Sequence, residues 1–171
     1  MKLTSTLLLG LGLLLMAPLA ARAQTFEVPT NVEYKTEADY KPLEPQVIAA
    51  VNWLETVPGN AEAVKRQQTN QFLLMWIQGA PNVSVGLQQY VTELCKSNPT
   101  LLGLFLGGWA RYSLQHPEDK TQLAPNLAAV QTMLNAYQKG GWEKDKNLDN
   151  LLALQNKGQL EAWVAKQIKR S

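Results

Sequence analysis

LLGLFLGGWA, residues 101–110, is almost wholly apolar and directly follows a helix-start signal. Asn98 can cap a helix and Pro99 suits its first turn, so the sequence predicts that a helix begins here. A helix with no polar face must be surrounded by protein. Crossing a bilayer takes about 20 apolar residues, and Arg111 ends this run too early. We therefore expect a buried central helix.

The glycines inside this segment indicate that another helix packs closely against it. Gly103 and Gly107 have the small-xxx-small spacing known from membrane helices, and Gly108 follows directly. Each glycine costs a helix about 1 kcal/mol relative to alanine. Close approach of a neighbouring backbone would offset this cost. The same spacing leaves open that two copies of the chain associate through Gly103 and Gly107.

Flanking segments repeat apolar residues every three or four positions, which is typical of amphipathic helices. Together with the central helix they predict seven helices, over residues 43–56, 60–78, 83–96, 101–115, 121–139, 147–157 and 159–169. The fifth could also begin at Pro125, and Asn60 and Asn147 are further candidate caps. Within 60–78, the polar first half should face water and the apolar run 72–77 should be buried on nearly every side.

The fold class that follows is all-α, an irregular bundle of about seven helices. Helix starts near 43, 83 and 123 are spaced by 40 residues, which keeps a short α-solenoid of helical hairpins as the alternative. The second members of these pairs do not keep the spacing, and this favours the bundle.

The N-terminus has the three parts of a secretory signal peptide: Lys2, an apolar core over 7–15, and small residues at Ala21 and Ala23. The core is too short for a membrane anchor. We expect cleavage after Ala23, a periplasmic or secreted protein, and no stable membrane span afterwards. The chain then divides into the signal peptide 1–23, an arm 24–42 and a helical domain 43–171. Alternating apolar residues predict that the arm is extended, either as one short strand or as a flexible leader.

Charge narrows the range of partners. The full chain has 16 Lys and Arg against 14 Asp and Glu, and loss of Lys2 and Arg22 leaves 14 of each, a net charge of zero. A neutral protein does not attract phosphate backbones or anionic membranes, so nucleic acid is not an expected partner. The single cysteine, Cys95, cannot form an internal disulfide. We expect it in the core, and the alternative is a reactive thiol or an intermolecular bridge.

Motifs for catalysis are missing from the sequence. The one histidine, His116, has no cysteine or histidine set around it, so no metal site is expected. Ser113 lies three residues before His116, but no orienting third group or oxyanion hole is recognisable. We predict no catalytic residue, no metal and no cofactor, and a non-enzymatic role is favoured over an enzymatic one.

One group of side chains is a candidate binding site. Trp109, Tyr112 and His116 share a helical face, with Arg111 at its edge, and could line one groove. The alternative is that Trp109 and Tyr112 are core residues whose polar atoms bond to backbone. Trp142, after two glycines, is either an exposed contact residue or a cover for one end of the bundle.

Three stretches carry a family resemblance: residues 72–81 (FLLMWIQGAP), 98–112 (NPTLLGLFLGGWARY) and 158–163 (GQLEAW). They are similar to a family of small exported helical proteins of Gram-negative bacteria with no assigned activity. The resemblance implies export and helicity and transfers no functional residue. We expect a non-enzymatic exported module that binds an envelope protein or a small ligand. The alternative is a small envelope hydrolase or lipid-handling protein that uses the face from Trp109 to His116.

Overall fold

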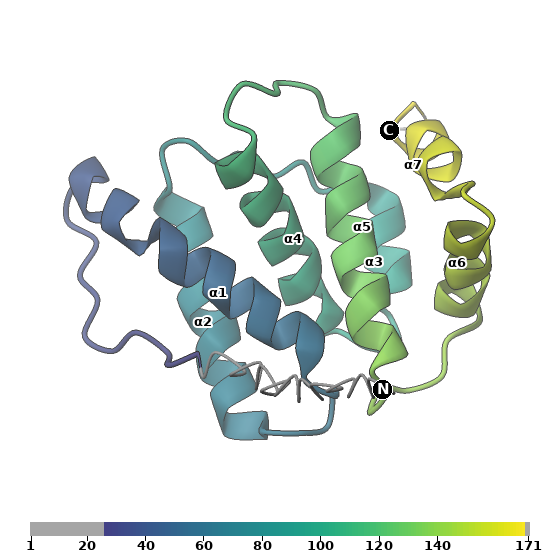
Figure 1. The fold of residues 1–171 in the computed structure, drawn as a ribbon, viewed down its shortest axis with the longest axis horizontal. Helices are drawn as coiled ribbons and strands as arrows, with labels where there is room; N and C mark the ends of the chain where they lie inside the picture. Colours follow the sequence, from purple (N-terminus) through teal and green to yellow (C-terminus); the bar gives the residue numbers. More distant parts are fainter. Residues whose placement is uncertain (1–25, 170–171) are drawn as a thin grey trace, which may run out of the picture.

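Seven α-helices make up most of residues 26–169, the part of the chain that the computed structural model describes (Figure 1). Two short 3₁₀ helices, η1 and η2, precede them, and no strand occurs within these residues. Their bounds are Glu37–Asp39 (η1), Lys41–Leu43 (η2), Glu44–Thr56 (α1), Ala63–Gly79 (α2), Gln89–Leu94 (α3), Leu101–Gln115 (α4), Leu123–Gln138 (α5), Lys146–Asn156 (α6) and Leu160–Ile168 (α7). The predicted all-α bundle is confirmed. The predicted signal peptide 1–23 lies outside the described residues.

The helix over 101–115 is at the centre, as predicted. α4 packs against α1, α2 and α5, and α5 in turn contacts α6 and α7 (Figure 1). Helices far apart in the sequence meet around α4, which is the arrangement of a bundle and not of stacked hairpins. The side chains of Leu101, Leu104 and Phe105 are almost completely buried in this core. Within residues 26–169, no helix combines the length and the apolar character that crossing a bilayer requires.

The glycines of α4 permit the close approach that the sequence predicted. A Cβ at Gly108 would lie 2.5 Å from Oγ1 of Thr132 and 3.0 Å from Cα of Ala129, both on α5. A Cβ at Gly107 would lie 2.8 Å from Cγ2 of Val51 on α1. Gly103 faces the side chain of Asn70 on α2. These close contacts lie within one chain.

The arm is only partly as predicted. Residues 26–36 have no regular secondary structure, and the short strand that the alternation allowed is not found there. The 3₁₀ helices η1 and η2 then replace the extended chain. Phe26 is buried against Trp53 of α1, with ring centroids 6.1 Å apart, and Tyr34 stacks on Tyr40 at 4.9 Å. Tyr40 in turn packs against Trp76 of α2, whose Nε1 donates to the Tyr40 carbonyl at 3.0 Å. Phe26 and Tyr40 therefore hold the arm on the bundle.

None of the three asparagines predicted as helix caps, Asn60, Asn98 and Asn147, caps its helix through its side chain. Asn98 bonds to a distant backbone segment instead, and α2 and α6 begin after other residues. α2 begins after Glu62, which has a left-handed φ of 49°, and not at Asn60. The Asn98 amide donates to O of Glu143 and accepts from its N–H, both at 2.9 Å. α6 is capped by Asp145, whose carboxylate accepts from the N–H groups of Asn147 and Leu148.

The helix predicted over 83–96 is much shorter in the structure. Only Gln89–Leu94 is helical, and residues 83–88 form a loop. Gly86 in this loop lies against the Trp109 indole, because a Cβ there would come 3.2 Å from the ring. Packing against α4 thus overrides the helical spacing. Cys95 is buried as expected, with 7% of its surface exposed.

Candidate functional site

The four residues predicted for binding lie in two places around α4. Trp109 and His116 line a cavity of about 680 Å³, whereas Arg111 and Tyr112 line a separate depression of about 230 Å³. Trp109 is 4% exposed and belongs to the core. The rings of Tyr112 and His116 lie 4.4 Å apart, so they contact each other. The single groove that the sequence suggested is therefore divided.

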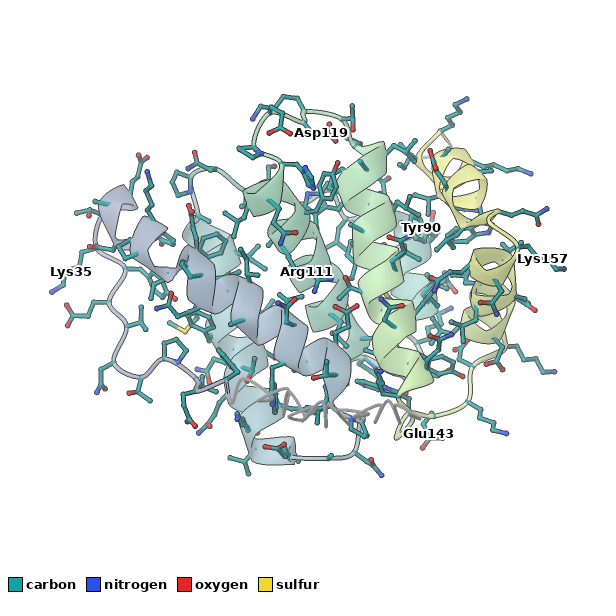
Figure 2. All side chains as sticks on the ribbon, viewed as in Figure 1. Lys35, Tyr90, Arg111, Asp119, Glu143 and Lys157 are labelled. Carbon is teal, nitrogen blue, oxygen red and sulfur yellow. The ribbon has the colours of Figure 1, made fainter. Side chains whose placement is uncertain are left out.

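Arg111 joins three helices (Figure 2). Its guanidinium donates to Glu55 Oε2 at 2.7 Å and Asn52 Oδ1 at 2.5 Å on α1, and to Thr132 Oγ1 at 2.9 Å on α5. The second oxygen of Glu55 accepts from Nδ2 of Asn135 at 2.6 Å. Both terminal nitrogens of Arg111 thus donate within the bundle, and the ion pair with Glu55 is half-buried, which is the arrangement of a structural ion pair.

His116 lines the larger cavity. Asp119, which lines it too, lies in the loop between α4 and α5 (Figure 2). Nδ1 of His116 is 3.8 Å from Oε1 of Glu118, and both side chains are largely exposed. Asp119 accepts from the N–H of Thr121 and from the Tyr112 hydroxyl at 2.7 Å, which lowers the pKa of Asp119 and raises that of Tyr112. Asp119 therefore orders the loop.

The chemistry around His116 is sparse. Ser113 lines the same cavity, but no hydrogen bond joins Ser113 to His116 in the described part of the chain. Over residues 26–169, no three His, Cys, Asp or Glu side chains come close enough together to hold a metal ion. The geometry gives neither an activated nucleophile nor a metal centre here.

A different surface stands out on α2. Seven of its residues are exposed and share one side of the helix, and none carries a charge; we call this set the α2 stripe: Val64, Gln67, Gln68, Gln71, Leu74, Met75 and Gln78. Val64, Leu74 and Met75 are 71%, 40% and 47% exposed. Single exposed apolar residues are common, but three on one uncharged helical face form a patch of the kind found at interaction sites.

The opposite face of α2 corrects the sequence prediction for this helix. Arg66 and Thr69, expected in water, are buried, whereas Leu74 and Met75, expected in the core, are exposed. The guanidinium of Arg66 bonds to carbonyl groups at the end of α1 and just beyond it, instead of to water. Its Nε donates to Pro58 O at 3.1 Å, and its Nη2 donates to the carbonyls of Leu54 and Val57. A positive charge there also matches the negative end of that helix.

Trp142 covers one end of the bundle next to Arg66, which is the second of the two roles predicted for it. Its ring centroid lies 5.0 Å from the Arg66 guanidinium, a cation–π contact. Its Nε1 donates to the carbonyl of Ala136 at 2.9 Å. A polar residue of α2 thus turns inward, and the helix is rotated so that the α2 stripe faces out.

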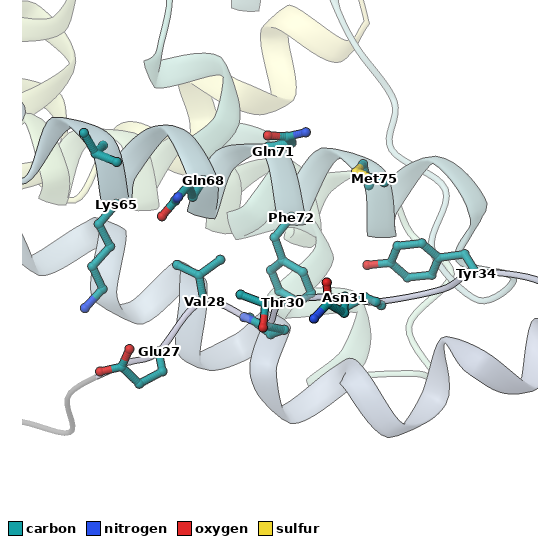
Figure 3. A pocket seen from close by; sticks show the side chains of 13 residues that line it. Glu27, Val28, Thr30, Asn31, Tyr34, Lys65, Gln68, Gln71, Phe72 and Met75 are labelled. Carbon is teal, nitrogen blue, oxygen red and sulfur yellow. The ribbon is translucent and has the colours of Figure 1, made fainter.

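Two grooves border the α2 stripe. The arm groove, about 590 Å³, lies between α2 and the arm, and Figure 3 shows the Phe72 ring pointing from α2 toward the arm, with Tyr34 at one end. The second groove, about 680 Å³, lies on the other side of α2 and reaches Thr100. Gln71 and Met75 line both.

Each groove contains a residue with a buried polar atom that has no partner: the Tyr34 hydroxyl in the arm groove and Oδ1 of Asn70 in the second. Burial raises the pKa of Tyr34, and the nearby Tyr40 adds to this effect. Buried polar groups are normally hydrogen-bonded. Both atoms are buried, and Oδ1 of Asn70 lies against Gly103 of α4, so they belong to the interior of the bundle and not to the groove surfaces.

No protein-family model, curated protein or solved structure matches this chain. The resemblance to small exported helical proteins accordingly stays a prediction. Sequence reasoning missed the α2 stripe, although a signal was present: Val64, Gln71 and Gln78 repeat every seven residues, as do Gln67 and Leu74. The apolar run 72–77 hid this spacing.

Proposed function

We propose that this protein is a non-enzymatic binding module of the cell envelope and that the α2 stripe is its docking surface. The observation that carries the proposal is the α2 stripe itself, with three exposed apolar side chains among four glutamines and no charge. Interface cores are depleted in charged residues, because covering a charge removes its hydration. Covering this stripe removes apolar surface from water at little such cost.

The partner that suits the stripe presents a helix. Apolar and amide side chains repeat along α2 at the three- and four-residue spacing by which helices pack together, and a helix lying in a groove is a common recognition mode. The two bordering grooves leave room for side chains on both flanks of such a partner.

Photo-cross-linking in the living cell tests this proposal. A photoreactive residue at Gln71 should form a discrete covalent adduct with a partner, and the adduct should vanish when Leu74→Glu is added. The matched control is the same residue at Gln131, which is exposed on α5. If Gln71 forms no more adduct than Gln131, the α2 stripe is not a docking surface.

Export is part of the proposal and has its own test. We propose that residues 1–23 are removed after Ala23, on the sequence pattern of a positive start, a short apolar core and small residues before the cleavage site. Mass spectrometry of the protein from the periplasm or medium should give a chain that starts at Gln24. A full-length chain retained in the cytoplasm would contradict it.

One observation favours a second candidate function, a hydrolase or lipid-handling activity. The cavity of about 680 Å³ brings Trp109, Ser113 and His116 to one surface. If this cavity is catalytic or holds acyl chains, purified protein should turn over a simple ester or bind a fluorescent fatty acid saturably, and His116→Ala should abolish the effect. Equal behaviour of the wild type and His116→Ala would dismiss this candidate.

A further inference from the structure

The α2 stripe has the spacing of a helix-pairing seam. Val64, Gln71 and Gln78 repeat every seven residues, and Gln67 and Leu74 repeat the same interval three residues later. Two rows offset in this way are the a and d rows of a coiled coil, where side chains of one helix enter spaces on another. All members of both rows are exposed. The seam is therefore complete over α2 and is not covered by the other residues of the described range, 26–169.

The composition of the seam points to one occupant. We propose that the α2 stripe of one chain packs against the α2 stripe of a second copy, which deepens the binding function proposed above. A carboxamide both donates and accepts hydrogen bonds, so a glutamine is a suitable partner for another glutamine. The stripe carries no charge, so two copies meet without like-charge repulsion, whereas a charged partner surface would be desolvated without a counter-charge.

A parallel pair of α2 helices matches each layer of the seam with its own kind. In a parallel two-fold pair, each residue of the seam faces its own copy, so that Leu74 packs on Leu74, Val64 on Val64 and the Gln71 amides bond to each other. An antiparallel pair centred on Gln71 would set Leu74 against Gln68 and Val64 against Gln78. Such layers bury amides without partners, which is unfavourable. A polar residue in the middle of the seam also fixes its register.

The size of the seam predicts a weak dimer. α2 has 17 residues and is about 25 Å long, and one helical seam covers less than the roughly 800 Å² per partner of a standard interface. We therefore expect reversible association with a dissociation constant in the micromolar range. The Gly103 and Gly107 surface is not required, because both glycines face their own chain.

Sedimentation of the purified protein is the first test. At about 100 μM the sedimenting mass should approach twice that of one chain and fall on dilution. Leu74→Glu and Gln71→Lys should each raise the dissociation constant at least about tenfold, whereas Gln131→Glu on α5 should leave it unchanged. A single monomeric species at about 100 μM would overturn the inference, and so would an equal effect of all three variants.

Engineered cysteines test the parallel arrangement. Under mild oxidation Val64→Cys alone should give a disulfide-linked dimer, because each new cysteine faces its own copy. The wild type should give none, since Cys95 is buried. If a disulfide forms only when Val64→Cys and Gln78→Cys chains are mixed, the pair is antiparallel and the inference is wrong as stated.

The two proposals fail in different ways. A monomeric purified protein whose Gln71 cross-links to another envelope protein would overturn the self-association and leave the binding function standing. A protein that neither dimerises nor cross-links at Gln71 would overturn both.

Discussion

Arg66 shows how one side chain orients a helix. Its guanidinium pairs with the carbonyls of Leu54, Val57 and Pro58 in a site that is 6% exposed. Arg66→Met should leave these acceptors unpaired and cost about 3 kcal/mol of unfolding free energy. Arg66→Lys keeps the charge but lacks the planar fork, so we expect a smaller loss, above about 1 kcal/mol.

Urea unfolding measures both Arg66 variants, with the exposed Gln131→Met as the control that should change little. An Arg66→Lys protein as stable as the wild type would mean that the fork geometry contributes nothing.

Cys95 gives a pH-dependent prediction. Burial raises the pKa of its thiol from 9.0 to about 11, so at pH 8 the folded protein should react with a thiol reagent about a hundredfold more slowly than the unfolded protein. The folded chain holds this proton more tightly, so the stability from thiol burial is complete below pH 9 and declines as the pH rises toward 11. Labelling at pH 8 with and without denaturant measures the rate ratio, and equal rates would show that the thiol is accessible.

Individual residue roles were the hardest part to predict from sequence. Asn98 has a good local reason to cap α4, but two hydrogen bonds to the backbone of Glu143, 45 positions away, prevail. The run 72–77 is apolar all round, so its composition cannot show that Leu74 and Met75 point outward. Leu74 and Met75 point outward because Arg66 turns inward. Arg66 does so because the carbonyl groups at the end of α1 accept its hydrogen bonds, and the sequence of α2 alone does not reveal this.

At the scale of elements, the contact between α4 and α5 depends on a missing side chain. Gly108→Ala would place a Cβ 2.7 Å from Cβ of Thr132 and 3.0 Å from Cα of Ala129. The strain should exceed the gain in helix propensity of about 1 kcal/mol and give a net loss of about 1–3 kcal/mol.

Gly103→Ala in the same helix is the matched control for Gly108→Ala. Its Cβ would meet mainly the Asn70 amide, the mobile end of a side chain, so the unfolding free energy should fall far less or rise. Thermal unfolding compares the two variants. Equal losses would show that the α4–α5 approach is not the limiting contact.

α6 depends on the carboxylate of Asp145. Burial alone would raise its pKa, but hydrogen bonds from Ser97 and from the N–H groups of Asn147 and Leu148 outweigh this and lower it below 3.8. The carboxylate therefore contributes stability that is complete above pH 3.8 and is lost as the pH falls through the lower folded-state pKa.

Asp145→Ala should cost about 1–2 kcal/mol at neutral pH, as for other lost helix caps, and less under acid conditions. Unfolding curves at neutral pH and near pH 3 measure this difference, with Glu37→Gln as an exposed control. A loss that does not change with pH would show that the charge of Asp145 is not involved.

Helices proved easier to predict than their ends. Spacing of apolar residues located α1, α4, α5 and α7 to within a few residues, because burial on one side of a helix leaves a direct periodic trace. The same rule overextended α3, where Gly86 packs on Trp109 and residues 83–88 become a loop. Loops shaped by distant contacts leave no such trace.

At the scale of the whole molecule, the arm should be a separate unit of lower stability than the bundle. No backbone–backbone hydrogen bond among the described residues involves 27–34, so this part of the arm is held by side chains, chiefly Phe26 against Trp53 and Tyr34 against Tyr40. Segments with few backbone hydrogen bonds open locally without global unfolding. Phe26→Ala should therefore release the arm and open the arm groove while the seven helices stay folded.

Limited proteolysis and thermal unfolding together test this expectation for Phe26→Ala. Cleavage within residues 27–35 should become at least about tenfold faster, because it follows the population of the open arm, whereas the melting temperature should fall only slightly. Val32→Ala, a smaller truncation in the same arm, is the control and should accelerate cleavage less. A large drop in melting temperature with unchanged arm cleavage would show instead that Phe26 belongs to the cooperative core, and that the arm and the bundle unfold as one.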